Sequence, residues 1–303
     1  MNIINDLNDL SLCDTAVCLG NFDGFHLGHK LVVSMMKSYA DNLGLRSVIF
    51  TFTPHPMQFF CKDILLLSTP NQRSEIFAEQ QVDYLVNAPF DNILSSLAPE
   101  DFFKNIIVDK LGAKVLVVGR DYRFGAGRSG GMELLHNLGE KYGVKCFFAD
   151  KVKDSCGIDI SSSRIRSLIS EGNVEKAAEC LGRNYCIDGV VIHGCGRGKE
   201  FGFPTANIKS ENMLIPNSVV YATDVTTEFS SYKSMTYIGT RPTVCNGTEV
   251  SIETNIFKLN KDIYDEPLRI YFKERIRGEI KFASIDELKS QMIKDMERAE
   301  NCK

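Results

Sequence analysis

The first half of the chain alternates short apolar runs with longer amphipathic segments. The apolar runs have the length of buried strands and lie at residues 16–19, 47–52, 84–87, 114–118 and 144–148. Between them, apolar residues recur at helical spacing over residues 30–43, 70–81, 99–111 and 131–142. Gly44 and Gly112 are expected to end two of these helices, and Ser129 to cap a third. Strands that alternate with helices form parallel β-α-β units, so the pattern predicts a doubly wound, Rossmann-like α/β domain.

The pattern changes after about residue 183. A helical segment over residues 163–181 precedes short β-rich runs at residues 186–194, 219–225, 235–239, 250–257 and 268–272. Short strands separated by turn residues are typical of an antiparallel barrel or sandwich. A last helix over residues 284–301 begins with the capping-box residues Ser284 and Glu287. We therefore expect two domains, residues 1–183 and 184–303, of which the second is mostly β with a C-terminal helix.

Composition and charge exclude several classes of protein. A chain of 303 residues is long enough for two domains, and its net charge of −4 predicts no nucleic-acid partner. The first 14 residues lack the apolar stretch of a secretory signal, and no apolar run approaches the roughly 18 residues of a membrane span. The ten cysteines include no C-x-x-C pair. We expect a cytoplasmic protein without membrane contact, structural zinc or disulfide, and no pattern predicts an oligomer.

Residues 20–29, with the sequence GNFDGFHLGH, stand between the first apolar run and the first helix. Backbone N–H groups and the helix dipole attract anions at such a place. His26 and His29 can donate hydrogen bonds to phosphate oxygens, and glycines let the backbone approach a ligand closely. Zinc is the alternative ligand, but no third zinc ligand stands nearby at a suitable spacing. The segment therefore predicts a phosphate-binding site.

Two further segments carry side chains that can bind phosphate. Residues 119–128, GRDYRFGAGR, directly follow an apolar run, and their three arginines suit a phosphate or flavin edge better than a solvated loop. Residues 160–166, ISSSRIR, open a helix. The serines could serve only as helix caps, or the hydroxyls, the helix N-terminus and Arg166 could together hold a triphosphate.

Together these segments resemble the nucleotidyltransferase half of bifunctional riboflavin kinase/FAD synthetases. The family motifs G-x-F-D-G-x-H-x-G-H, T-F-x-P-H-P, G-x-D-[FY]-x-F-G and S-S-[ST]-x-I-R match residues 20–29, 51–56, 119–125 and 161–166. The resemblance implies adenylyl transfer, in which the FMN phosphate attacks the α-phosphorus of ATP and pyrophosphate leaves, with His26 and His29 stabilising the transition state. It places ATP and its phosphates at Gly20, Phe22, Asp23, Gly24, Asp121, Ser162, Ser163 and Arg166. It places the flavin at Phe52, Pro54, His55, Arg123 and Phe124.

The segment from residue 194 to residue 207, GCGRGKEFGFPTAN, is the second dense motif. It is not a P-loop, because Lys199 is followed by Glu200 and no helix pattern follows. Its glycines alone could mark ordinary bends of a barrel. Thr205 and Asn207 stand two residues apart in an extended segment, so they point the same way and can share a metal ion or a phosphate.

This segment resembles the riboflavin kinase domain of the same family, whose mark is G-x-x-x-G-x-x-x-G-F-P-T-A-N. Further motifs match at residues 238–243, 252–255 and 277–282. The resemblance implies transfer of the ATP γ-phosphate to the ribityl 5′-hydroxyl of riboflavin, with Glu253 as the base. Without the resemblance, an isolated glutamate in a strand would be interpreted as a solvent-facing residue. The resemblance places ATP at Gly194, Gly198, Gly202, Pro204, Thr205 and Asn207. It places Mg²⁺ on Thr205 and Asn207, and the flavin at Arg277 and Phe282.

The chain departs from the family pattern at a few positions. Asp159 stands where a basic residue often precedes the I-S-S segment, and Arg73 where lysine is common. In the kinase half, Val219 replaces a usual glycine and Asn255 a frequent histidine. The leading hypothesis is a bifunctional enzyme that makes FMN and then FAD from riboflavin and ATP, with Mg²⁺ as cofactor and pyrophosphate as product. The alternatives are that the kinase half alone is active, or that the chain is a non-catalytic flavin-binding regulator.

Overall fold

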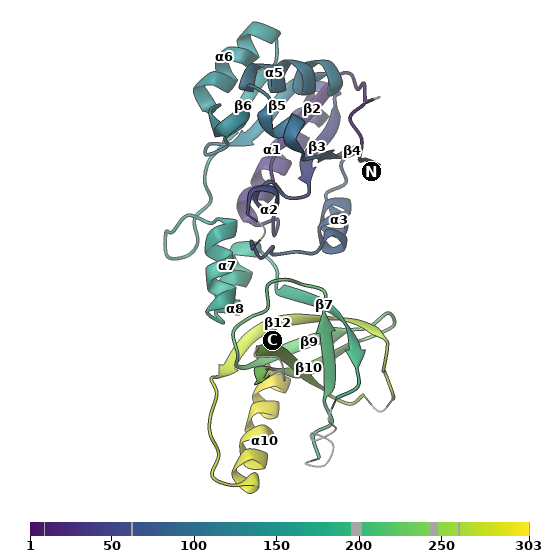
Figure 1. Ribbon diagram of the computed structural model, residues 1–303, viewed down its shortest axis with the longest axis vertical. Helices are drawn as coiled ribbons and strands as arrows, with labels where there is room; N and C mark the ends of the chain where they lie inside the picture. The colour runs from purple at the N-terminus through teal and green to yellow at the C-terminus, as the bar shows by residue number, and fades with distance from the viewer. Residues whose placement is uncertain (9, 62, 195–201, 243–247, 260, 303) are drawn as a thin grey trace. The chain divides into compact units, whose positions relative to one another are not determined.

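The computed structural model describes residues 1–303 except residues 9, 62, 195–201, 243–247, 260 and 303. The chain forms two compact units (Figure 1). The first unit comprises residues 1–64 and 70–161, and the second comprises residues 65–69 and 162–303. The division of function between residues 1–183 and 184–303 stays a prediction.

The first unit is built on a six-stranded sheet with the order β1-β4-β3-β2-β5-β6. All of these strand pairs are parallel. The strands are β1 (Asn2–Ile4), β2 (Thr15–Leu19), β3 (Arg46–Thr53), β4 (Tyr84–Pro89), β5 (Ala113–Gly119) and β6 (Lys145–Ala149). All five residues of β2 are buried, and the last four of them form a continuous apolar run, as a central strand covered on both faces requires. The predicted Rossmann-like domain is therefore confirmed.

Helices cover both faces of this sheet. They are α1 (Leu27–Leu43), α2 (Pro56–Phe60), α3 (Pro70–Glu79), α4 (Asn92–Ser96), α5 (Pro99–Phe102), the π-helix η1 (Phe103–Lys110), the 3₁₀-helix η2 (Ala126–Arg128) and α6 (Met132–Tyr142). On one face, α1 and α3 pack through residues such as Met36 and Phe77. On the other face, η1 and α6 pack through residues such as Ile107 and Leu138. The result is a three-layer sandwich in which the carboxyl ends of the strands remain open to loops.

The helix boundaries of this unit confirm some sequence predictions and correct one. Gly44 ends α1 in the left-handed conformation, with φ of 65°, and its N–H donates to the carbonyl of Ala40. Ser129 is not the cap of α6, which begins only after Gly131. The Ser129 hydroxyl donates instead to the carbonyl of Ala126, at 2.8 Å, inside the preceding turn. That prediction was wrong because the hydroxyl of a serine near a helix start can hydrogen-bond within the preceding turn as readily as it can cap the helix.

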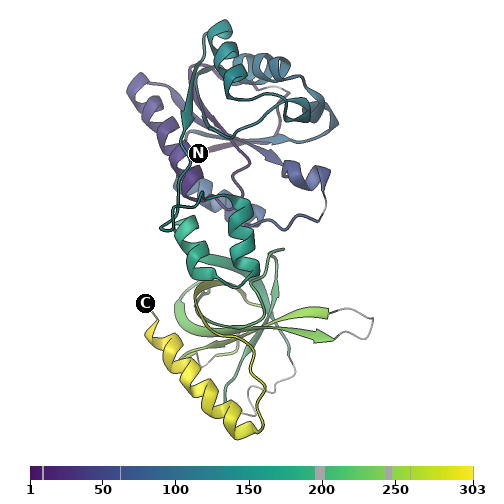
Figure 2. The ribbon, with the colours of Figure 1, turned by 90° about the vertical axis from the view of Figure 1, so that its left-hand side faces the viewer.

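The second unit begins with two helices and continues as a β-barrel. The segment predicted as one helical stretch divides into α7 (Ser162–Ser170) and α8 (Val174–Leu181), because Gly172 adopts φ of 78° between them. The two helices run side by side as an antiparallel pair, drawn in teal in Figure 2. The strands are β7 (Tyr185–Ile192), β8 (Ala206–Ser210), β9 (Val220–Thr226), β10 (Ser231–Pro242), β11 (Thr248–Ile256) and β12 (Pro267–Arg277).

These strands close into an antiparallel barrel with the order β10-β11-β8-β7-β12-β9, in which β9 also pairs with β10. The barrel interior holds a chain of buried hydroxyls. Thr223 bonds to Ser234 at 2.7 Å and to Thr236 at 2.8 Å, and Thr236 bonds to Thr254 at 3.0 Å. Each buried hydroxyl therefore has a partner, as a low-dielectric interior requires. The closed barrel is confirmed, and the sandwich alternative is excluded.

The C-terminal helix α10 (Ile285–Asn301) packs on the outside of the barrel (Figure 2). Its predicted cap is present, since the Ser284 hydroxyl accepts the N–H of Glu287 at 3.2 Å. The Asp295 carboxylate is only 2% exposed and accepts hydrogen bonds from Arg277, at 2.7 Å, and from Gln291, at 2.8 Å. A buried, fully paired carboxylate thus fastens α10 to the end of β12.

We expect Asp295→Ala to lower the free energy of unfolding of the barrel by about 3–5 kcal/mol, because it leaves the Arg277 charge buried without its partner. The measurement is urea unfolding of the full chain followed by circular dichroism. Asp286→Ala, at an exposed position in the first turn of the same helix, is the matched control and should cost less than about 1 kcal/mol. Equal effects of the two substitutions would contradict a structural role for the buried pair.

Candidate active sites

The loop from Gly20 to His29 follows the carboxyl end of β2, where ligands bind in open parallel sheets. His26 caps α1, and its Nδ1 accepts the N–H of His29 at 3.4 Å. The two imidazole rings stack with their centroids 3.7 Å apart and their planes 18° from parallel. A Cβ on Gly28 would lie 3.0 Å from the His26 ring. The motif therefore builds a fixed pair of histidines at a helix N-terminus.

The phenylalanines of this loop pack against the histidine pair. Phe22 is buried and meets the His29 ring edge-on at 5.3 Å. Gly20 leaves room for that phenylalanine, since a Cβ there would come within 2.9 Å of its ring. Gly24 has φ of 74°, a conformation that favours glycine. Phe22 and the buried Asp23 were predicted to contact ATP, and that role stays a prediction.

Arg73, which stands where the family commonly has lysine, adds a positive charge to this site. It extends from α3, and its Nη2 donates to the carbonyl of Phe52 at 3.2 Å and to the hydroxyl of Thr53 at 3.1 Å. Burial lowers the pKa of Arg73, and the negative charge of Asp23 opposes that shift. A guanidinium stays protonated under such conditions, so it can pair with a phosphate beside the histidines.

A cavity of about 500 Å³ lies beyond the carboxyl ends of β3 and β5. Three of the five residues predicted to bind flavin line it, namely Phe52, Arg123 and Phe124. It is also lined by Asn21, Pro56, Met57, Phe60, Phe90, Leu94, Ser95, Phe102, Asp121, Tyr122, Gly125, Gly127 and Arg128. Its volume suits a ligand of cofactor size.

Pro54 and His55, also predicted to bind flavin, are not among the residues that line this cavity. The side chain of His55 is buried, with 5% exposed. Its Nδ1 accepts the N–H of Met57 at 3.1 Å and thereby caps α2. In this structure, His55 positions α2, which itself supplies part of the cavity wall.

Six of the sixteen residues that line the cavity are aromatic. Phe90 meets Phe52 edge-on at 5.4 Å and Phe60 at 5.9 Å. Tyr122 and Phe124 lie nearly parallel on the other wall, with their centroids 6.4 Å apart. Burial raises the pKa of Tyr122, so its hydroxyl stays protonated at neutral pH. Such walls match a flat apolar ring system better than a sugar or a peptide.

Glycines shape the loop that carries Arg123 and Phe124. Phe124 and Gly130 exchange backbone hydrogen bonds of 3.2 and 2.9 Å, which close the loop. A Cβ on Gly130 would lie 2.5 Å from the Phe124 ring, and one on Gly131 would lie 2.5 Å from Nη1 of Arg123. These glycines therefore accommodate specific side chains, which argues against a merely solvated loop.

Asp159, the departure from the family pattern, has its charge paired within the first unit. Nζ of Lys151 lies 3.1 Å from the Asp159 carboxylate and 3.9 Å from that of Asp121. The hydrogen bond to Asp159 raises the pKa of Lys151, and the negative charges of both carboxylates add to the rise. A lysine thus compensates the acidic residue that stands where a basic one is common.

Ser162, Ser163 and Arg166 lie on α7 in the second unit. Ser162 and Arg166 are half-buried, and Ser163 is exposed. The buried side chains of α7 are Ile165, Leu168 and Ile169. The serines therefore stand at a helix N-terminus, which suits phosphate, and their role as ATP ligands stays a prediction.

Strand pairing in the barrel brings the predicted kinase residues together. Glu253 on β11 lies directly opposite Asn207 on β8, so the two side chains share one face of the sheet. Glu253 is half-buried and accepts a hydrogen bond from the Ser251 hydroxyl at 3.1 Å. Asn255, another departure from the family pattern, donates to the carbonyl of Pro204 at 2.6 Å. It thereby ties the Pro204–Asn207 segment to β11.

The glycine segment before Asn207 is only partly described. Gly198 lies among residues 195–201, outside the described residues. Gly202 adopts φ of 89°, which favours glycine. Gly194 lies directly against Asn207, since a Cβ on Gly194 would come 2.0 Å from Nδ2 of the amide.

The donor set at Thr205 and Asn207 fits Mg²⁺ bound together with phosphates. Both side chains are half-buried and offer a hydroxyl and an amide oxygen, which are hard ligands. Across the described parts of the chain, no group of three His, Cys, Asp or Glu side chains is placed to hold a metal ion. An ion held by two protein oxygens and by substrate phosphates needs no such group.

Arg277 and Phe282, the predicted flavin-binding residues of the kinase half, also lie together. The Arg277 guanidinium carbon is 5.6 Å from the centre of the Phe282 ring. Its Nε is fixed by the ion pair with Asp295. The two side chains therefore lie in contact where the chain runs from β12 to α10.

We expect Gly194→Ala to slow FMN formation by at least about tenfold, because the new methyl group must displace the Asn207 amide from its place, at a cost of more than about 1.4 kcal/mol. The measurement is the initial rate of riboflavin phosphorylation. FAD formation from supplied FMN, catalysed by the same chain, is the internal control and should not change. A variant with wild-type kinase rate would show that the amide position is unimportant.

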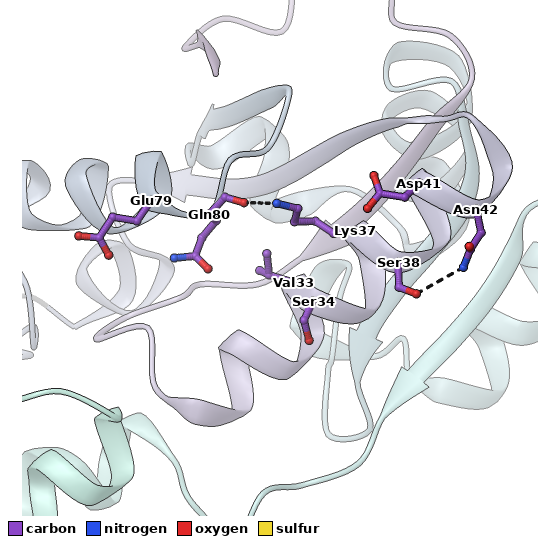
Figure 3. Close-up of a pocket in the computed structure, with 8 residues that line it drawn as sticks. All are labelled: Val33, Ser34, Lys37, Ser38, Asp41, Asn42, Glu79 and Gln80. Atoms are coloured by element: carbon purple, nitrogen blue, oxygen red, sulfur yellow. Dashed lines mark hydrogen bonds between the residues drawn. The ribbon is translucent and has the colours of Figure 1, made fainter.

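A second hollow, of about 540 Å³, lies between α1 and the end of α3 (Figure 3). Lys37 on α1 donates to the carbonyl of Gln80 at 2.6 Å and to that of Gln81 at 3.3 Å. A lysine in this position satisfies carbonyls left unpaired at the helix end. The hollow contains none of the predicted site residues, and we interpret its polar groups as helix capping.

Comparisons with known proteins match both units. The FAD synthetase family model matches residues 9–164, and the riboflavin kinase family model matches residues 181–303. The bifunctional riboflavin kinase/FMN adenylyltransferase of Buchnera aphidicola subsp. Schizaphis graminum is 32% identical, over 98% of this chain and 97% of its own length. The protein of the same name from Escherichia coli K12 is 33% identical, over 97% of this chain and 96% of its own length.

A solved structure is similar over the full length. It is titled a macrolide-efflux protein from Streptococcus pneumoniae, is 31% identical, and matches with a TM-score of 0.90 over 99% of each chain. Within the described part of the present chain, every helix is too short or too polar to cross a membrane.

Proposed function

Because the chain belongs to the bifunctional riboflavin kinase/FMN adenylyltransferase family, we propose that it converts riboflavin to FMN and then FMN to FAD. We assign the adenylyltransferase to residues 1–183 and the kinase to residues 184–303. The observation that carries the proposal is the pairing of Glu253 with Asn207, beside Gly194, on one face of the barrel. A non-catalytic flavin-binding regulator would have no need of that arrangement.

In the kinase step, Glu253 accepts the proton of the ribityl 5′-hydroxyl, and the hydroxyl oxygen attacks the γ-phosphorus of ATP. The bond to the β-γ bridging oxygen breaks, and ADP leaves. Thr205 and Asn207 would hold Mg²⁺, which neutralises charge on the transferred phosphoryl group when it is bound. Arg277 and Phe282 bind the flavin, and the glycine segment that includes Gly194 and Gly202 borders the ATP phosphates.

In the adenylyltransferase step, a phosphate oxygen of FMN attacks the α-phosphorus of ATP, and pyrophosphate leaves. His26 and His29 donate hydrogen bonds to the charge that develops on the α-phosphate. The cavity between Phe52 and Phe124 binds the isoalloxazine ring. Ser162, Ser163 and Arg166 hold the departing phosphates. Such a reaction depends mainly on positioning and charge neutralisation, which these groups supply.

The setting follows from the two reactions. Riboflavin, FMN, FAD, ATP and pyrophosphate are the small-molecule partners, and both steps consume ATP. We therefore place the enzyme in the cytoplasm. The net charge of −4 supports no nucleic-acid partner.

A time course of flavin products tests the proposal. Purified protein is incubated with riboflavin, ATP and Mg²⁺, and the flavins are separated by chromatography. We expect FMN to form first and FAD to follow. The absence of FMN would refute the kinase assignment, and FMN that never proceeds to FAD would refute the adenylyltransferase assignment.

A further inference from the structure

Tyr237 on β10 stands directly opposite Glu253 in the β10–β11 pair. Side chains of directly opposite residues lie on the same face of a sheet. The residues of β10 on the other face, such as Thr236 and Ile238, are buried inside the barrel, whereas Tyr237 is 38% exposed. The phenol therefore shares the outer face of the barrel with the proposed base.

The Tyr237 ring has a defined place on that face. Gly239, two residues further along β10, provides the space, since a Cβ there would lie 2.6 Å from the tyrosine hydroxyl. Gly239 is itself opposite Ser251, whose hydroxyl donates to Glu253. The ring thus lies along the strand beside the Ser251–Glu253 pair.

The Tyr237 hydroxyl reaches a second carboxylate. It donates to Oε1 of Glu279 at 3.3 Å. Burial raises the pKa of Tyr237, and the negative charges of Glu279 and Glu253 raise it further. The phenol is therefore protonated at neutral pH and available as a donor.

Glu279 belongs to the segment that carries the two flavin-side residues. It follows Arg277, which is fixed to α10 through Asp295, and precedes Phe282, which lies beneath the Arg277 guanidinium. Among the described residues, the Tyr237–Glu279 hydrogen bond joins this segment to the strand opposite Glu253. Without this hydrogen bond, the ion pair of Arg277 with Asp295 would still hold the start of the segment, but Glu279 would have lost its hydrogen bond to β10.

We propose that Tyr237 is a positioning residue for riboflavin, which holds the Arg277–Phe282 segment beside Glu253 through its hydrogen bond to Glu279. The proposal rests on the proposed kinase function and deepens it. Tyr237 contributes to binding of the flavin rather than to the chemical step. ATP, on the side of Thr205 and Asn207, is bound independently of it.

The test is the kinetics of Tyr237→Phe, which removes the hydroxyl and keeps the ring. We expect the KM for riboflavin to rise about tenfold. This is the lower end of the effects seen on losing a hydrogen bond to a charged group, because Tyr237 is partly exposed. The kcat and the KM for ATP should each change by less than about twofold, as for loss of uniform substrate binding. Glu279→Ala, which removes the acceptor, should raise the KM for riboflavin in the same way, and the double variant should be no worse than either single variant.

Tyr232→Phe is the matched control, because Tyr232 lies on the same strand but on its opposite face. It should leave all three constants unchanged. An unchanged KM for riboflavin in Tyr237→Phe, an equal rise in the KM for ATP, or effects that multiply in the double variant would overturn the proposal. Failure of the kinase assignment itself is distinguishable, because the wild-type chain would then form no FMN.

Discussion

Replacing Glu253 by glutamine is expected to slow FMN formation by about 10²–10⁴-fold, the usual contribution of a general base. Glutamine keeps the size of the side chain and can still bond to Ser251, so the β11–β8 pairing should persist. The loss therefore reports on proton acceptance rather than on folding. FAD formation from supplied FMN should be unchanged, because Glu253 lies in the second unit and the histidine pair in the first.

The measurement is the initial rate of each step with its own substrate, together with the melting temperature. Glu211→Gln is the control, at an exposed glutamate immediately after β8, and should leave both rates unchanged. If Glu253→Gln retained the kinase rate, the base would have to be another group. If both steps were lost, the two sites would not be independent.

Replacing His29 by asparagine is expected to lower the rate of FAD formation from FMN by about 10²–10³-fold, as for removal of one preorganised donor to a developing charge. His29 stacks on His26 and meets the edge of Phe22, so its ring is held where it can face an α-phosphate. His26 is less suitable for the test, because it also caps α1 and its loss would cost stability.

The rate of riboflavin phosphorylation by the same variant is the internal control and should not change. His136→Asn, at an exposed histidine that lies 3.5 Å from Glu140 on α6, is the matched control for histidine loss. Unchanged FAD formation in His29→Asn would remove that residue from its proposed role.

The sequence predicted the architecture well because its apolar periodicity is strong. The five predicted strands of the first unit occur where the apolar runs lie, and so do the barrel strands β7, β9, β10, β11 and β12, whereas no predicted run covers β8. Strand β1 and helices α2 and α4 were not predicted, because three to five residues are too few to show a period. The helical stretch before the barrel was not divided correctly, because its break depends on the backbone conformation of Gly172.

The motifs predicted the candidate sites but not all of the residues that surround them. Phe60 and Phe90 line the aromatic cavity, yet they come from segments without a motif and meet only in the folded sheet. Arg73 reaches the site from α3 through hydrogen bonds to the end of β3. The pairing of Asp159 with Lys151 is likewise a tertiary contact, and it explains how the chain compensates an acidic residue at that position.

The central claim is that one chain carries out two chemically distinct transfers from ATP. It is tested most directly by supplying riboflavin with ATP labelled at either the γ- or the α-phosphorus and locating the label in each flavin. We predict that the γ-label enters FMN and is retained in FAD, and that the α-label enters FAD alone. An α-label in FMN, or FAD that carries neither label, would contradict the claim.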